Sequence, residues 1–268
     1  MLQYKITDCE FNSFRDFIYE YAGIRLSNEK KTLVTSRLSK RLRHYSLSSF
    51  QEYFDLIMSS PPDGERQMTV DLLTTNETYF FREPKHFNFL EKEILSKRKS
   101  GKMLRIWSAA SSSGEEAYSI AMLLDDVMGK QPWEIFGSDI SSRVLKKAQK
   151  GHYLQCRIDG IPQEYLQKYC LKGTGEHEGT LLIDRALRQR VTFSAVNLKC
   201  PLGNVGFFDV IFLRNVLIYF DLETKRKIVS KLVDKLQRGG YLFIGHSESL
   251  KGINDNLDAV IPTVYRKA

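Results

Sequence analysis

Apolar residues in the N-terminal part of the chain recur every three or four positions. The recurrence runs through 11–21, 34–45 and 50–57, and this spacing is typical of helices that bury one face. A cluster rich in proline and glycine at 59–64 then interrupts the pattern. We therefore expect an all-α N-terminal domain over residues 1–74.

A second pattern begins at Met103, where short apolar runs alternate with longer helical stretches. The expected strands cover 103–108, 133–137, 191–196, 208–213 and 241–245, and the expected helices cover 114–128, 141–150 and 222–236. Alternation of this kind predicts an α/β fold with a doubly wound, parallel sheet. We assign this domain to 91–268 and expect its ligand site at the carboxyl ends of the strands.

Residues 151–190 do not fit a minimal doubly wound fold. They combine a helix-like stretch at 162–170 with a hairpin-like turn at 173–179 that leads into an apolar run. This pattern predicts a small antiparallel β insertion. His152 and His177 belong to this insertion, but they have no cysteine or paired histidine close by in the sequence. We therefore interpret both as structural or surface residues and expect no metal site.

The composition is typical of a globular protein. With 268 residues and 42% hydrophobic content, the chain is long enough for one large domain or two modest ones. No apolar run approaches the about 20 residues that cross a bilayer, and the N-terminus lacks the apolar core of a secretory signal. We therefore expect a cytoplasmic protein without membrane insertion. The cysteines are widely scattered, which argues against a zinc site and against a disulfide framework.

The charge of the chain favours an anionic partner. A net charge of +8 and a pI of about 9.2 suit nucleic acid, an acidic membrane face or an acidic protein surface. Much of the excess lies in one stretch without an acid, which contains Lys30, Lys31, Arg37, Lys40, Arg41 and Arg43. On a helix, most of these residues lie beside the apolar stripe of 34–45. The stretch is then either a binding surface or an ordinary solvated helix face.

Two polar segments carry candidate site residues. Arg214, Asn215 and Tyr219 follow the predicted strand 208–213, where a ligand usually binds. The alternative is an ordinary strand end with a capping asparagine and a half-buried tyrosine. Residues 74–84 are rich in side-chain donors and lie between two predicted helices. That segment is either a ligand clamp or a polar connector.

The ends of the first two strands narrow the choice of ligand. The turn at 108–116 consists largely of small residues, so its backbone can approach a ligand closely, and Asp139 can accept both hydroxyls of a ribose. The turn lacks the Gly-x-Gly-x-x-Gly pattern of dinucleotide sites, and Glu115 and Glu116 would repel a pyrophosphate. A nucleoside with a neutral or cationic tail fits better, and S-adenosylmethionine has these properties.

Five blocks of sequence add up to a family resemblance. The blocks are 75–83, 107–116, 138–140, 214–221 and 245–249. In this order they closely resemble the bacterial chemotaxis receptor methyltransferases, the CheR family, and the resemblance covers nearly the whole chain. It implies a class I (Rossmann-like) methyltransferase domain that transfers a methyl group from S-adenosylmethionine to specific glutamates on the cytoplasmic helical bundle of chemoreceptors. The products would be glutamyl methyl esters and S-adenosylhomocysteine.

The resemblance also implies roles for individual residues. It assigns Asn76, Thr78 and Arg82 to a linker, 75–90, that helps to enclose the cofactor, with Arg82 near its carboxylate end. The other expected cofactor contacts are Glu116 at the amino group, Asp139 at the ribose, Asn197 and Leu198 beside the adenine, and Arg214 and Asn215 in the rest of the pocket. Tyr219 and Arg82 are expected next to the transferring methyl. Since a glutamate is already ionised at pH 7, we expect Tyr219 to orient the reactants rather than to accept a proton.

Two further features of the family concern the receptor. Arg37, Lys40 and Arg43 match basic residues with which the N-terminal domain of the family meets the acidic receptor bundle, and Arg41 lies among them. In some members the β insertion binds the C-terminal pentapeptide of a receptor by strand addition. Whether this chain does so is left open by the sequence.

Two other functions fit parts of the sequence. The basic pI would suit a nucleic-acid methyltransferase, but the Pro-Pro-aromatic motif typical of methylation at base amino groups is missing from 214–217. We therefore expect no nucleic-acid partner. A non-catalytic sensor or adaptor could retain the same fold, but Arg82, Asp139, Asn215 and Tyr219 are all present.

Overall fold

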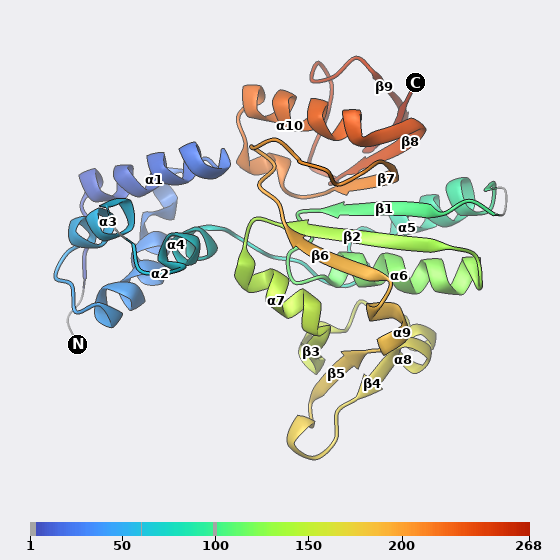
Figure 1. The fold of residues 1–268 in the computed structure, drawn as a ribbon, viewed down its shortest axis with the longest axis horizontal. Coiled ribbons are helices and arrows are strands. Elements are labelled where there is room, and N and C mark those ends of the chain that lie inside the picture. Colours follow the sequence, from blue (N-terminus) through green and yellow to red (C-terminus); the bar gives the residue numbers. More distant parts are fainter. Residues whose placement is uncertain (1–3, 60, 99–100) are drawn as a thin grey trace.

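Four helices form the N-terminal domain of the computed structural model, which describes residues 4–59, 61–98 and 101–268 (Figure 1). They are α1 (Asp8–Ala22), α2 (Lys31–His44), α3 (Phe50–Ser59) and α4 (Glu65–Leu73), with a 3-10 turn, η1 (Asn28–Lys30), before α2. The apolar stripes predicted from the sequence meet in one core, in which Phe14, Leu38 and Tyr53 are fully buried. The expected all-α unit is confirmed.

The main sheet has seven strands within the described part of the chain, in the order β6-β2-β1-β7-β8-β10-β9. Their bounds are β1 (Leu104–Ala109), β2 (Trp133–Asp139), β6 (Val191–Ala195), β7 (Phe208–Leu213), β8 (Leu236–Ile244), β9 (Leu257–Ile261) and β10 (Val264–Lys267). The strands from β6 to β8 are parallel, and β10 is antiparallel to β8 and β9. The doubly wound α/β class is confirmed, whereas the hairpin β9–β10 was not predicted.

Helices cover both faces of this sheet because successive strand residues point to opposite sides. In β7, Phe212 packs into one core with α6 (Glu115–Met128), while the adjacent Ile211 packs into the other core with α10 (Leu222–Lys235). The first core also receives α5 (Pro84–Phe89) and a π-helical turn, η2 (Leu90–Leu95). Helix α7 (Ser142–Lys150) packs against β2 and β6 and also contacts α4.

The predicted β insertion is present and forms a small antiparallel sheet in the order β3-β5-β4 (Figure 1). Its elements are β3 (His152–Leu154), η3 (Gln155–Arg157), α8 (Gln163–Tyr169), β4 (Cys170–Lys172), η4 (Gly175–His177) and β5 (Thr180–Ile183), and the short helix α9 (Arg185–Arg188) follows. Tyr153, Ile161 and Tyr169 bury the insertion against the core on the α6 face. In the ranges that the structure describes, no helix has the length and apolar character needed to cross a membrane.

Asp71, near the end of α4, joins the N-terminal domain to the sheet domain. It is 1% exposed and accepts hydrogen bonds from the backbone N–H of Ser142 at 2.9 Å, the hydroxyl of Ser142 at 2.8 Å and the N–H of Arg143 at 3.1 Å. The first N–H groups of a helix have no partner within the helix. A carboxylate from one domain therefore caps helix α7 of the other.

We predict that Asp71→Ala lowers the free energy of unfolding by about 1–2 kcal/mol, because it removes a helix cap and leaves buried donors without a partner. Urea titration followed by circular dichroism measures this difference. Asp63→Ala is the matched control, since Asp63 is exposed and its loss should change stability by less than about 0.5 kcal/mol. Equal effects of the two substitutions would contradict the capping role.

Candidate active site

A cavity of about 380 Å³ lies between the N-terminal domain, the linker and the carboxyl ends of the central strands. This size is within the range of small-molecule sites. The residues expected from the sequence at the cofactor and the methyl group all line it: Asn76, Thr78, Arg82, Glu116, Asp139, Asn197, Leu198, Arg214, Asn215 and Tyr219. The fold thus gathers them in one place, while their contacts with a cofactor stay predictions.

The small-residue turn after β1 forms part of the cavity wall. Ala110, Ser112 and Gly114 have positive φ angles of 67°, 50° and 93°, so the chain reverses within a few residues. A Cβ atom on Gly114 would lie 2.9 Å from the Cβ of Ala148, which makes glycine necessary there. The tight turn brings backbone to the cavity edge, as the sequence indicated.

Asp139 stands at the end of β2, where this turn holds it. Its carboxylate accepts hydrogen bonds from the N–H groups of Ser112 and Ser141, both at 2.9 Å. Burial raises the pKa of Asp139 to about 6, against the opposing effect of these hydrogen bonds, so the group is mainly ionised at neutral pH. A carboxylate has about four acceptor positions, and those that remain suit the two hydroxyls of a ribose.

Glu116 lies in the first turn of α6 with its side chain 13% exposed. One oxygen accepts from the hydroxyl of Ser108 at 2.7 Å, and the other lies 3.0 Å from Nη1 of Arg214. Burial raises the pKa of Glu116, while Arg214 opposes that shift. A carboxylate in this position fits a cationic group such as the α-ammonium of an amino acid.

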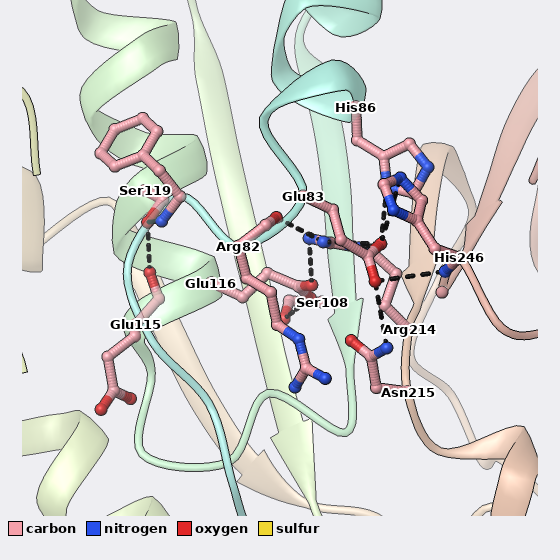
Figure 2. Close-up of polar contacts among 12 residues, drawn as sticks. Arg82, Glu83, His86, Ser108, Glu115, Glu116, Ser119, Arg214, Asn215 and His246 are labelled. Carbon is pink, nitrogen blue, oxygen red and sulfur yellow. Dashed lines mark hydrogen bonds and ion pairs between the residues drawn. The ribbon is translucent and has the colours of Figure 1, made fainter. Parts of the chain in front are cut away.

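Arg214 and Asn215 both turn towards Glu83, as Figure 2 shows. Nη2 of Arg214 lies 2.9 Å from Oε2 of Glu83, and Nδ2 of Asn215 donates to Oε1 at 3.1 Å. No role for Glu83 was expected from the sequence. No local pattern signals the pairing, because 131 residues separate Glu83 from Arg214.

Glu248 is a second buried acid without a predicted role. Its carboxylate accepts from the N–H groups of Gly245 at 2.6 Å, Asn215 at 3.1 Å and Ile218 at 3.3 Å. Burial raises its pKa, and these N–H groups oppose the rise. Glu248 therefore fixes the loop that carries Tyr219 to the end of β8. Its place in the block 245–249 was the available signal.

Arg82 and Tyr219 both line the cavity, on the linker and on η5 (Leu217–Tyr219). The guanidinium of Arg82 lies over the ring of Tyr79, 5.4 Å from its centroid, and donates to the carbonyl of Glu77 at 3.2 Å. Burial raises the pKa of Tyr219, with Arg82 acting in the opposite direction. The phenol therefore stays protonated at neutral pH and can donate a hydrogen bond.

Both polar atoms of the Asn197 side chain form hydrogen bonds within the protein. Its Nδ2 donates to the carbonyl of Tyr21 at 2.7 Å, and its Oδ1 accepts from the N–H of Lys199 at 3.0 Å. The side chain is thus occupied in holding α1 and the following turn. Leu198 and Ile140 line the cavity beside it, and a place next to an adenine stays a prediction.

The segment between α1 and α2 closes the cavity from the N-terminal side, which the sequence did not indicate. Ile24, Arg25, Ser27 and Lys30 all line it, and the N–H of Arg25 donates to the carbonyl of Tyr219 at 2.9 Å. This wall comes from a part of the chain about two hundred residues away from Tyr219, so no sequence motif connects the two.

Glu83, His86 and His246 form a cluster whose potential metal-ligating atoms all lie within 4.8 Å of one another. However, Glu83 is already bound by Arg214 and Asn215. Burial, followed by the charge of Arg214, lowers the pKa of His86 to about 4. We interpret this cluster as part of the polar network around Arg214. His152 and His177, considered in the sequence, have ring centroids 5.9 Å apart in the insertion.

The basic stretch of α2 is less uniform than expected. Arg41 forms an ion pair with the buried Glu65 of α4 at 2.6 Å, and Arg37 donates to the carbonyls of Leu72 and Thr74 at 2.9 and 2.8 Å. These two arginines therefore hold the helical domain together instead of forming an open face. The stretch contains no acid of its own, and Glu65 of α4 provides the negative charge that pairs with Arg41. Lys40 and Arg43 are exposed.

Comparisons with known proteins agree with this arrangement. A family model described as "CheR methyltransferase, all-alpha domain" matches residues 10–74, and one described as "CheR methyltransferase, SAM binding domain" matches residues 76–265. The chain is 41% identical over 263 residues to the chemotaxis protein methyltransferase of Escherichia coli strain K12, covering 97% of this chain and 91% of the relative.

Two relatives from other bacteria are similar over the same extent. Chemotaxis protein methyltransferase 2 of Pseudomonas aeruginosa is 39% identical, with 99% of this chain and 95% of the relative covered. The chemotaxis protein methyltransferase of Borreliella burgdorferi is 37% identical, with 99% and 96% covered. The chain therefore belongs to the CheR family and is an S-adenosylmethionine-dependent methyltransferase.

Proposed function

We propose that the chain transfers a methyl group from S-adenosylmethionine to specific glutamate side chains in the cytoplasmic domain of chemoreceptors, forming glutamyl methyl esters. The observation that carries the proposal is that one cavity is lined by two acids, Asp139 and Glu116, together with Arg82 and Tyr219. The names of the relatives, chemotaxis protein methyltransferases, support the same activity.

In this proposal each part of the cavity has a task. Asp139 accepts the ribose hydroxyls, Glu116 holds the amino group, and the turn at Asn197 and Leu198 lies beside the adenine. The other proposed contacts are Asn76, Thr78 and Arg82 on the linker and Arg214 and Asn215 at the end of β7. The product, S-adenosylhomocysteine, keeps these contacts and loses only the methyl group and its charge.

The chemistry needs few catalytic groups. S-adenosylmethionine supplies a methyl group that is already activated by a positive sulfur. The acceptor glutamate is ionised at pH 7, so its carboxylate oxygen forms the new C–O bond while the C–S electron pair returns to sulfur, and no proton moves. Arg82 and the protonated Tyr219 align the carboxylate. Good alignment of two reactants is worth about 7–11 kcal/mol of barrier.

The outer surfaces suit a receptor partner. We assign residues 1–74 to receptor contact, 75–90 to a linker that contributes to the cofactor site, and 91–268 to methyl transfer. Lys40 and Arg43 offer exposed positive charge to an acidic helical bundle. The insertion, about 151–190, has an edge strand, β4, with an exposed Leu171, which fits capture of a receptor's C-terminal pentapeptide by strand addition. Such partners also imply a cytoplasmic location.

Incubation with radiolabelled S-adenosylmethionine and purified chemoreceptor cytoplasmic domains tests the activity. We expect label on the receptor that is released as volatile methanol in base, because esters hydrolyse there. Receptor domains with the acceptor glutamates replaced by alanine are the control and should take up no label. Base-stable label, or label on nucleic acid instead, would contradict the proposal.

Replacement of Tyr219 by phenylalanine should lower kcat about tenfold to hundredfold, since a hydrogen bond to a charged group is worth about 1.5–3 kcal/mol. The affinity for S-adenosylhomocysteine should change less than twofold. Tyr21→Phe makes the same chemical change outside the cavity lining and should keep full turnover. A Tyr219→Phe enzyme with wild-type kcat would exclude the orienting role.

The exposed charges of α2 lead to another prediction. The double reversal Lys40→Glu with Arg43→Glu should raise the KM for receptor about twofold to thirtyfold, given that each exposed ion pair contributes about 0.2–1 kcal/mol. The effect should shrink as salt screens the charges, and cofactor affinity should stay constant. Arg238→Glu with Lys251→Glu changes the net charge equally at exposed positions of the sheet domain and is the control. Equal KM values for the two double variants at low salt would refute the assignment.

A further inference from the structure

Glu83 has a backbone conformation that a glutamate rarely adopts. Its φ and ψ angles are 60° and 67°, in the left-handed region, and it directly precedes Pro84, which itself disfavours helical angles in the preceding residue. Such a conformation is strained and persists where the surrounding contacts impose it. The strain at Glu83 therefore points to a role for its side chain.

The side chain of Glu83 is 10% exposed and is surrounded by donors (Figure 2). One oxygen faces Arg214 at 2.9 Å, and the other accepts from Nδ2 of Asn215 and from the N–H of His246, both at 3.1 Å. Although burial opposes ionisation, the charge of Arg214 and these hydrogen bonds lower the pKa of Glu83 to about 2. Glu83 is therefore a fixed negative charge next to the cavity.

Arg214 connects this charge to Glu116. Its side chain is 1% exposed and lies between the two acids, with Nη1 3.0 Å from Glu116 and Nη2 2.9 Å from Glu83. Nη2 also donates to the carbonyl of Arg82, and Nε donates to Glu83 at 3.2 Å. Most N–H groups of this guanidinium therefore bind the linker residues Arg82 and Glu83. Its positive charge lies next to two carboxylates.

The charge balance of these three groups leaves one negative charge unmatched. Glu83 and Glu116 contribute two negative charges and Arg214 contributes one positive charge, and the unmatched charge faces the cavity at Glu116. If Glu83 were neutral, Arg214 would cancel Glu116 completely. A ligand cation in contact with Glu116 would then be attracted less strongly, because the guanidinium of Arg214 repels it.

We propose that Glu83 is a positioning residue that takes up the charge of Arg214 and thereby reserves Glu116 for the α-ammonium of the ligand's amino acid tail. The inference rests on the proposed placement of that tail at Glu116. It makes the linker a determinant of ligand specificity, because a nucleoside thioether without the amino acid tail gains nothing from this arrangement.

Two ligands that differ in the tail test the proposal by calorimetric titration. S-adenosylhomocysteine carries the amino acid tail, and 5′-methylthioadenosine has the same nucleoside and thioether without it. We expect Glu83→Gln to weaken S-adenosylhomocysteine binding about tenfold to hundredfold, in line with the loss of a contact to a charged group. The Kd of methylthioadenosine should change less than twofold.

Two variants complete the experiment. Glu164→Gln makes the same substitution at an exposed position of α8 and should leave both Kd values unchanged. Glu83→Asp keeps the charge on a shorter side chain and should give a smaller loss, about threefold, again confined to S-adenosylhomocysteine. This variant carries the test if Glu83→Gln does not fold.

The outcomes distinguish the proposed tail contact at Glu116 from the proposed role of Glu83. A wild-type protein that binds S-adenosylhomocysteine no more tightly than methylthioadenosine would overturn the proposed tail contact at Glu116. A wild-type preference that survives Glu83→Gln would overturn only the role of Glu83. Equal weakening of both ligands in the Glu83 variants would also overturn that role, since it would indicate general damage to the cavity.

Discussion

The buried ion network of Arg214 with Glu83 and Glu116 is the interaction on which the site depends. It joins the linker, the end of β7 and the start of α6, each of which contributes residues to the cavity lining. Removing one partner from a buried ion pair commonly costs about 3–5 kcal/mol, so the network resists rearrangement. It also offsets the strained backbone at Glu83. The same contacts that order the linker therefore set the charge of the cavity.

The second constraint is the attachment of the helical domain. The carboxylate of Asp71 caps α7 of the sheet domain, the hydroxyl of Tyr19 donates to Asp221 at 2.6 Å, and the N–H of Arg25 donates to Tyr219. Through these contacts the N-terminal domain forms one wall of the cavity. The position of Tyr219 is consequently coupled to the domain that carries Lys40 and Arg43.

The basic helix illustrates how charge in a sequence divides between stability and binding. Arg37 donates to backbone carbonyls and Arg41 pairs with Glu65, whereas Lys40 and Arg43 are exposed to solvent. Burial decides which is which, because a partly buried guanidinium needs its donors satisfied. At about 100° per residue, a helical wheel places Arg37 and Arg41 nearer to the apolar stripe than Lys40 and Arg43. It does not identify Glu65 or the carbonyls of Leu72 and Thr74 as their partners.

The features that depend on local sequence pattern, which are the helices, the parallel strands and the strand ends, could be predicted from the sequence. Apolar periodicity gave the strands of the parallel sheet, the helices between them and the helical domain, and the polarity of a parallel sheet brings strand ends such as Asp139 and Arg214 to one edge. The hairpin β9–β10 escaped prediction because no pattern in the last twenty residues was assigned to strands.

The contacts between segments that are distant in sequence became apparent only in the folded structure. Glu83 with Arg214, Glu248 with the Tyr219 loop, and Arg25 on the cavity wall join residues that are far apart in sequence. The packing of whole helices and strands determines which of these residues become neighbours. A buried charge then pairs with the opposite charge that lies next to it. The cavity-lining residues at the strand ends and on the linker could therefore be expected from the chain, whereas the charge balance and the backbone strain at Glu83 required the fold.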